Sequence, residues 1–190
     1  MTAPTVATEK KTLDPGVVYA TRAGLESATN HLAYLREQLV KTNEGAESAD
    51  FHGDHDPGTL HATTHARSIE TEIESLGFIL DNQRTVIVED LDFVGIVWPG
   101  TEIAVEIDGK NRTLIILGPF DQRQDVHQEE IQSRIASYHS PLIQPLLGHQ
   151  AGDKVVIPQL PNGKRDVGVT ILSVAPWPPK TTKESPQPVA

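Results

Sequence analysis

The sequence contains no cysteine, which excludes disulfide bonds, thiolate catalysis and cysteine-based zinc sites. No apolar run approaches the roughly 18 residues of a membrane-spanning helix, and the N-terminus lacks the apolar core of a signal peptide. No Ser-His-Asp arrangement, phosphate-binding glycine loop or dinucleotide fingerprint is present either. We therefore expect a soluble cytoplasmic protein without a membrane contact, and one that is not itself an enzyme.

Basic residues are few compared with acidic ones. The 190 residues include 16 Lys and Arg against 26 Asp and Glu, for a net charge of −10. Nucleic-acid phosphates repel such a chain, so independent binding to DNA or RNA is not expected. A basic protein surface or a divalent cation suits this charge better. The length allows one ordinary domain, or two small ones with tails.

The segment between Lys41 and Arg67 has no basic residue at all. It lies between two segments whose apolar residues recur with alternating spacings of three and four, a pattern typical of a coiled coil. The acidic residues of this segment are Glu44, Glu47, Asp50, Asp54 and Asp56. The first apolar stripe is Leu25, Ala28, Leu32, Leu35 and Leu39, and the second is Ala62, Ala66, Ile69, Ile73, Leu76 and Leu80.

Two such stripes joined by a Gly- and Pro-containing connection predict an antiparallel helical hairpin from about Thr21 to Asp81. Helices of this size form a rod of roughly 30 Å, at a rise of ~1.5 Å per residue. The acidic group would then lie at the tip of the rod. Such a rod could carry carboxylates into a space that a globular body cannot enter.

From Thr85 onward the pattern changes to β-type alternation. Asp108-Gly109 is a favoured hairpin turn, and residues 161–163 predict another. One short helix is expected over Leu142–Leu147, ended by Gly148. Helices separated from strands in this way predict an α+β fold with a mainly antiparallel sheet. The expected strands are 85–88, 102–107, 112–117, 134–138, 154–157 and 167–172.

The chain therefore divides into four predicted regions. A flexible arm without periodicity comes first, then the coiled-coil hairpin, then the sheet domain, and last a proline-rich tail expected to be disordered. Their boundaries are 1–18, 19–82, 83–175 and 176–190.

Two motifs resemble the Gre transcript-cleavage factors of bacterial RNA polymerase. Residues 135–153, with Ser140-Pro141-Leu142, Gly148 and Gly152-Asp153, are similar to the C-terminal signature of that family. Residues 19–25, read Y-A-T-R-A-G-L, are similar to its opening motif. Ser140 suits a helix N-cap, Gly148 a helix stop, and Gly152-Asp153 a turn into a strand.

The resemblance implies a mechanism. Gre factors dock at the rim of the polymerase secondary channel through an FKBP-like C-terminal domain, and their coiled coil carries acidic tip residues to the catalytic magnesium. The implied partner is the polymerase core, with the nascent RNA nearby. The chain would act as a monomer without a cofactor of its own, sharing Mg²⁺ with the polymerase. The implied docking residues are Ser140, Pro141, Leu142, Gly148, Gly152 and Asp153.

The predicted tip departs from the family pattern. His52-Gly53-Asp54 matches its first part, but Pro57 stands where the family has a glutamate. Asp56 is the nearest substitute, and a one-residue shift in the alignment would place it at that position. Asp54 and Asp56 are therefore the predicted metal-assisting carboxylates. A homologue that occludes the channel and inhibits transcription would suit the altered tip as well.

Two further interpretations of the tip stay open. An acidic loop at the end of a helical hairpin can simply be a solvated turn. His61 and His65 are four residues apart, a spacing found in zinc sites, although the intervening residues do not form an H-E-x-x-H motif. A metal-binding His/Asp module unrelated to polymerase is therefore the remote alternative.

Overall fold

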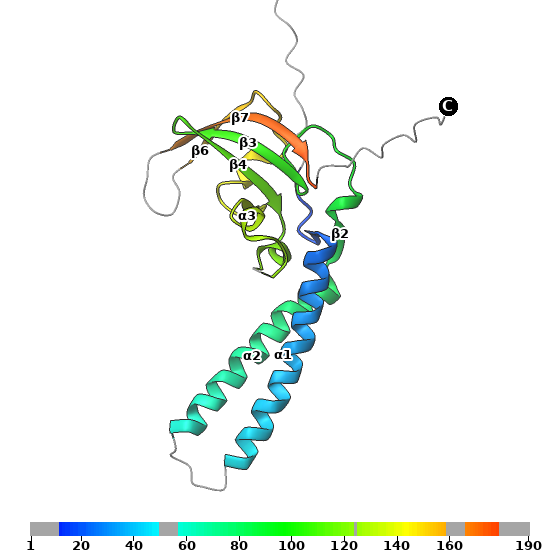
Figure 1. Cartoon of the computed structure of the whole chain (residues 1–190), viewed down its shortest axis with the longest axis vertical. Coiled ribbons are helices and arrows are strands. Elements are labelled where there is room, and N and C mark those ends of the chain that lie inside the picture. The colour runs from blue at the N-terminus through cyan, green and yellow to red at the C-terminus, as the bar shows by residue number, and fades with distance from the viewer. Residues whose placement is uncertain (1–11, 50–56, 124, 159–165, 179–190) are drawn as a thin grey trace, which may run out of the picture.

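The computed structural model describes residues 12–49, 57–123, 125–158 and 166–178. A helix pair extends from one end of a sheet domain, as Figure 1 shows. Within the described residues, no helix is long and apolar enough to cross a membrane. The coarse α+β prediction is confirmed, because helices and a multi-stranded sheet occupy separate parts of the chain.

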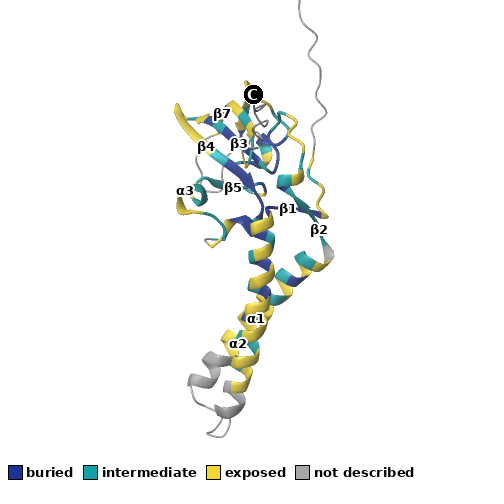
Figure 2. Ribbon diagram, turned by 45° about the vertical axis from the view of Figure 1, so that its right-hand side comes forward, coloured by how far each residue is buried: buried dark blue, intermediate teal, exposed yellow. Residues whose placement is uncertain are grey.

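The helix pair consists of α1 (Arg22–Ala49) and α2 (Pro57–Asn82), which run in opposite directions side by side (Figure 1). The predicted stripes face each other in the half nearer the sheet. Ala28, Leu32, Leu35 and Ile69 are buried there. Figure 2 shows that the described far half is mostly exposed. The pair is therefore held by one narrow apolar seam along two otherwise polar helices.

The residues at the start of each helix explain where the helix begins. Thr21 caps α1, because its Oγ1 accepts a hydrogen bond from the Gly24 N–H at 2.9 Å. Pro57 opens α2, a position where the missing N–H costs nothing and the fixed φ suits a helix.

A two-stranded parallel sheet lies where the helix pair meets the sheet domain. β1 (Val17–Ala20) pairs with β2 (Arg84–Ile87), so the two ends of the hairpin region are bonded to each other. The predicted arm over 1–18 extended too far, because Val17 and Val18 are buried in β1. All four β1 residues are buried, so the strand lacks the alternation by which strands are recognised in a sequence.

The main sheet has five strands in the order β5-β4-β3-β7-β6. All pairs are antiparallel except β4 with β5. The predicted turn between β3 and β4 is confirmed, with φ of 51° at Asp108 and 72° at Gly109. The strands are β3 (Thr101–Ile107), β4 (Lys110–Leu117), β5 (Ile135–Ser137), β6 (Lys154–Ile157) and β7 (Val167–Pro176).

The single short helix predicted over Leu142–Leu147 is wrong in type and extent. The structure has a 3₁₀ turn there, η4 (Gln144–Leu146). Pro145 lacks the N–H that an α-helix starting at Pro141 would need. Three further short helical turns occur: η2 (Val88–Asp90), η3 (Pro119–Gln122) and α3 (Glu129–Gln132).

The core of the sheet domain extends to residues assigned to the tail. Tyr138 is fully buried, and its ring stands edge-on to Tyr19 at 5.8 Å. The predicted tail over 176–190 began too early, since Pro176 ends β7 and Trp177 packs against the core. Residues 179–190 lie outside the described part of the chain.

Candidate functional site

The carboxylates predicted for the tip, Asp54 and Asp56, lie outside the described residues. α1 is described to Ala49 and α2 from Pro57, so both residues belong to the connection between the helices. Figure 1 places the two flanking helix ends at the end of the molecule away from the sheet. The approach of these carboxylates to a metal ion stays a prediction.

The histidine-based metal site at the tip also stays a prediction. In the part of the chain that the structure describes, no group of three or more His, Asp or Glu side chains is placed to hold a metal ion. His65 is exposed on α2, and the side chain of His61 is outside the described part.

Charged side chains along the helix pair form surface contacts. Glu37 and Lys41, one turn apart on α1, have a 2.6 Å Nζ–Oε1 distance. The hydrogen bond from Lys41 lowers the pKa of the Glu37 carboxyl. Between the helices, His31 Nε2 and Glu72 Oε1 are 2.9 Å apart. Exposed ion pairs of this kind contribute little stability. The apolar seam therefore supplies most of the free energy that holds the two helices together.

The first half of the predicted docking motif forms the turn after β5. Ser140 Oγ accepts a hydrogen bond from the Ile143 N–H at 3.3 Å and so stabilises the turn over residues 141–143, whereas the helix that it was predicted to cap is not formed. Leu142 is half-buried and packs against the core, whereas Pro141 is exposed. Of these three, Pro141 is therefore the residue most available to a partner.

The second half of the motif builds the turn into β6. Gly148 and Gly152 have φ of 82° and 94°, a region that favours glycine. Asp153 Oδ2 accepts a hydrogen bond from the Gln150 N–H at 3.0 Å and lies 3.1 Å from His149 Nδ1. The Gln150 bond, and then the His149 contact, lower the pKa of the Asp153 carboxyl. Gly148, Gly152 and Asp153 therefore determine the backbone conformation of this turn.

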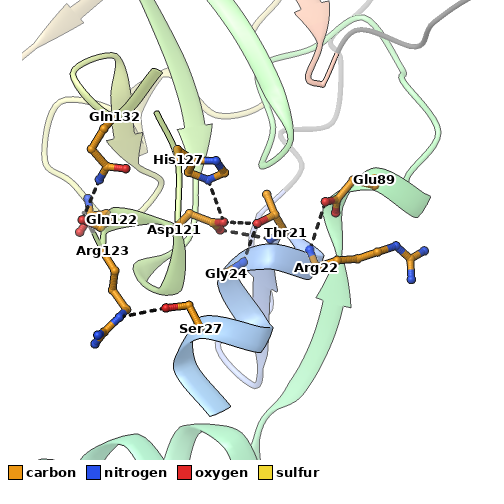
Figure 3. Close-up of polar contacts among 10 residues, drawn as sticks. All are labelled: Thr21, Arg22, Gly24, Ser27, Glu89, Asp121, Gln122, Arg123, His127 and Gln132. Atoms are coloured by element: carbon orange, nitrogen blue, oxygen red, sulfur yellow. Dashed lines mark hydrogen bonds and ion pairs between the residues drawn. The ribbon is translucent and has the colours of Figure 1, made fainter. Parts of the chain in front are cut away.

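A buried carboxylate joins the start of α1 to η3 of the sheet domain. Asp121 is fully buried, and its Oδ2 accepts a hydrogen bond from the Thr21 N–H at 3.1 Å. The Thr21 hydroxyl donates to Oδ1 of the same carboxylate (Figure 3). His127 Nε2 lies 3.3 Å from Oδ1. Since a buried carboxylate needs such partners, Asp121 connects the two parts of the molecule.

The backbone of α1 approaches this carboxylate very closely. A Cβ placed on Gly24 would lie 2.4 Å from Asp121 Oδ1, closer than any side chain tolerates. A carboxylate beside the first turn of a helix is also stabilised by the helix dipole. Glycine at position 24 therefore permits the contact between α1 and the sheet domain.

Three further contacts hold the start of α1. The Arg22 N–H donates to Glu89 Oε1 at 3.1 Å, and the Arg22 guanidinium pairs with Asp90, both on η2. On the other side of the helix, Ser27 Oγ donates to Asp125 Oδ2 at 2.7 Å. That hydrogen bond is the largest cause of a lowered pKa at the Asp125 carboxyl. Polar contacts from two segments thus fix the direction of α1, and Figure 3 shows one from each, Arg22 with Glu89 and Ser27 with Arg123.

The sequence did not predict this junction. Threonine directly before an amphipathic segment is a recognisable N-cap signal, and Thr21 has that role. The partner, Asp121, is 100 residues further along the chain in an irregular segment. No local pattern marks it as buried or pairs it with Thr21.

No family model matches the sequence, and no curated protein matches it. Among solved structures, GreA factor homolog 1 (Gfh1) of Thermus thermophilus is 23% identical over 83% of this chain and 97% of that one, with a TM-score of 0.37. Gfh1 of Thermus aquaticus is 24% identical over 83% and 97%, with a TM-score of 0.34.

A further similar structure is described as the prokaryotic transcription elongation factor GreA/GreB from Nitrosomonas europaea. It is 16% identical over 83% of this chain and 96% of that one, with a TM-score of 0.32. These structures are described as a GreA factor homolog and a GreA/GreB factor, the family that the two sequence motifs resemble.

Proposed function

We propose that this protein is a Gre-type transcription factor that docks on the bacterial RNA polymerase core at the secondary channel. The observation that carries the proposal is the helix pair that extends from the sheet domain (Figures 1 and 2). The polar junction contacts involve Thr21 and Ser27 at the start of α1. Next to them, Leu25 and Ala28 of α1 and Leu76, Ile79 and Leu80 of α2 belong to one apolar cluster with Phe120. The described part of the pair beyond these residues is therefore available to enter a narrow channel as an antiparallel coiled coil.

The dimensions and chemistry of the pair suit this role. The 28 residues of α1 span about 42 Å at the helical rise. The connection at its far end carries Asp54 and Asp56, and carboxylates are ligands that Mg²⁺ prefers. These carboxylates would help to hold a second magnesium ion beside the polymerase's own, and such an ion would stabilise the attacking and leaving oxygens of RNA cleavage. The protein would act in the cytoplasm as a monomeric accessory factor near the RNA, without binding DNA itself.

The sheet domain is the proposed docking module, with an FKBP-like fold. The exposed Pro141 is the part of the motif best placed for contact. Binding to purified polymerase core should be measured by gel filtration, and Pro141→Glu should weaken it. Pro158→Glu, at an exposed proline after β6, is the matched control and should bind normally. Failure of the unaltered protein to bind the core would contradict the docking proposal.

Cleavage of backtracked RNA is the proposed outcome of docking. The assay uses a stalled, backtracked complex with labelled RNA, with and without the protein. The protein should release short RNA fragments, and Asp54→Ala combined with Asp56→Ala should abolish them while core binding remains. Loss of binding in the double variant would mean that these residues dock rather than assist cleavage.

One observation favours a second function. Pro57 is the first residue of α2, so the position three residues after Asp54 opens a helix and carries no carboxylate. A factor with such a tip would occlude the channel without supporting cleavage. In that case nucleotide addition by an active complex should slow when the protein is added, and no short fragments should appear.

A further inference from the structure

A groove lies on the sheet domain, beside the junction with the helix pair. It has a volume of about 230 Å³ and is lined by residues from the segments 88–101 and 176–178. Phe93 and Val94 on one side are 40% and 58% exposed. None of the predicted docking residues lines the groove, although Ile96, which does, pairs with Gln150 of the motif segment.

The lining is apolar and aromatic with an acidic border. Trp98 and Trp177 both line the groove, together with Pro99 and Pro178. The acidic residues are Glu89 and Asp92. Grooves lined by aromatic rings bind proline-rich segments in an extended conformation, because such segments lose little entropy on binding. A proline-rich occupant with basic residues fits both the surface and the charge.

Glu89 gives a second indication of an occupant. Its Oε1 accepts the hydrogen bond from the Arg22 N–H, but its Oε2 is buried and has no hydrogen-bond partner among the described residues. A buried carboxylate oxygen without a donor costs free energy, so an arriving ammonium or N–H group would be favoured there.

We propose that this groove binds the C-terminal segment of the same chain, residues 179–190. The described chain ends at Pro178, which itself lines the groove. The segment contains three prolines, and two lysines stand before its one acidic residue. The prolines are Pro179, Pro186 and Pro188, and the lysines are Lys180 and Lys183.

The covalent connection makes this occupant favourable even if the intrinsic contact is weak. An extended proline-type segment rises about 3.1 Å per residue, so residues 179–190 span up to about 37 Å and can turn back along the groove. A short connection gives an effective concentration of about 1 mM, which favours binding of the attached segment over a free peptide.

The bound segment would also lie against the groups that fix α1. Trp177, in the groove, stands edge-on to the His127 ring at a centroid distance of 5.3 Å, and His127 contacts Asp121. Glu89, which also lines the groove, accepts a hydrogen bond from the Arg22 N–H. Occupation of the groove therefore stabilises His127 and Glu89 in the positions from which they contact Asp121 and Arg22.

Tryptophan fluorescence tests the proposal directly, because the chain has two tryptophans and both line the groove. The full chain should be compared with a chain that ends at Pro178. The shorter chain should show emission shifted to longer wavelength and stronger quenching by acrylamide. Unchanged emission and quenching would overturn the proposal. Far-UV circular dichroism shows whether the shorter chain keeps its fold.

A peptide titration is the second readout. A synthetic peptide of residues 179–190 should bind the shorter chain saturably and restore the emission of the full chain. The full chain, whose groove is already occupied, should bind the peptide at least about tenfold more weakly. Equal binding to both chains would mean that the groove is open to a separate partner, and the proposal would be wrong.

A full-length variant avoids the new carboxylate that truncation places at Pro178. Lys180→Glu combined with Lys183→Glu should move emission and quenching toward the values of the shorter chain. The corresponding variant peptide should bind about threefold to tenfold more weakly, as expected for two partly exposed ion pairs. Lys110→Glu, on the exposed β3–β4 hairpin, is the control and should change nothing. If deletion of residues 1–11 produces the shift instead, the occupant is the N-terminal segment and the proposal fails.

Discussion

At the scale of single residues, the most important side chain in the described structure is Asp121. Burial of a carboxyl group costs free energy unless donors satisfy its oxygens, and Thr21 and His127 lie within hydrogen-bonding distance. The carboxylate adds a polar contact beside the apolar cluster that Ala28 of α1 forms with Phe120 of η3. Stability and the direction of α1 therefore depend on the same group.

Asp121→Ala should lower the free energy of unfolding by about 3 kcal/mol, because the Thr21 donors stay buried without an acceptor. Chemical denaturation followed by circular dichroism measures this. The matched control is Asp81→Ala, at an exposed position of α2, which should change the value by less than about 0.5 kcal/mol. Similar values for the two variants would contradict the role assigned to Asp121.

The same substitution at two helical glycines should have opposite effects. Gly77 lies in α2 with nothing within 4 Å of an added Cβ, so Gly77→Ala should stabilise the protein by about 0.5–1 kcal/mol. Gly24→Ala should destabilise it despite the better helix propensity, because the new Cβ meets Asp121 Oδ1. Thermal unfolding of both variants, measured side by side, gives the signs. Stabilisation by Gly24→Ala would show that the close contact is absent.

Asp153, one of the predicted docking residues, also contributes to the stability of the fold. Hydrogen bonding lowers the pKa of its carboxyl in the folded state below the unfolded value. A lowered pKa stabilises the fold at pH values above the unfolded pKa, about 4, and this contribution is lost as pH falls through the folded pKa. Asp153→Asn should therefore reduce stability at pH 7 and flatten its decline between about pH 5 and pH 2.

Denaturant titrations at several pH values measure this decline. Asp108→Asn, at the exposed β3–β4 turn, serves as the control, because asparagine also suits a positive φ. An unchanged acid profile for Asp153→Asn, together with weaker polymerase binding, would assign the residue to docking rather than to the turn.

At the scale of elements, patterns with a clear period were predicted well. The leucine and isoleucine stripes indicated both long helices, and the seam residues Leu32, Leu35 and Ile69 are buried as expected. Asp108-Gly109 indicated the β3–β4 hairpin because few residues tolerate positive φ at both turn positions. These features are local, so the sequence displays them directly.

Elements stabilised by distant contacts were predicted poorly. Val17 and Val18 read as part of an arm, because their strand depends on parallel pairing with β2, more than sixty residues later. A short helix was expected over Leu142–Leu147, but Pro145 has no N–H for an α-helical hydrogen bond, and a 3₁₀ turn forms instead. The Thr21–Asp121 contact had no local signature either. The tip residues Asp54 and Asp56 remain predictions from the sequence motifs.

The pairing of β1 with β2 predicts where truncation becomes harmful. A chain that begins at Thr12 keeps every described residue and should fold normally. A chain that begins at Thr21 lacks β1, including the buried Val17, Val18 and Tyr19, and should lose cooperative unfolding. Circular dichroism and thermal melts distinguish the two. Equal melting of both chains would show that β1 contributes nothing to the fold.

At the scale of the whole molecule, a helix pair contacts the sheet domain at the start of α1 and the end of α2. The described far half of the pair is mostly exposed, as Figure 2 shows. An isolated protein gains little from such a shape, because the extended pair buries only a narrow seam. The shape is useful if a larger partner surrounds the pair, which is the central claim of the proposed function.

Site-specific photocrosslinking to RNA polymerase core tests that claim most directly. A photoreactive residue in place of Asp54 should crosslink to the lining of the secondary channel next to the catalytic centre. The same residue in place of Lys110, on the β3–β4 hairpin, should crosslink outside the channel or not at all. Crosslinks from position 54 to the outer surface of the polymerase, or none in a complex that has formed, would contradict the account.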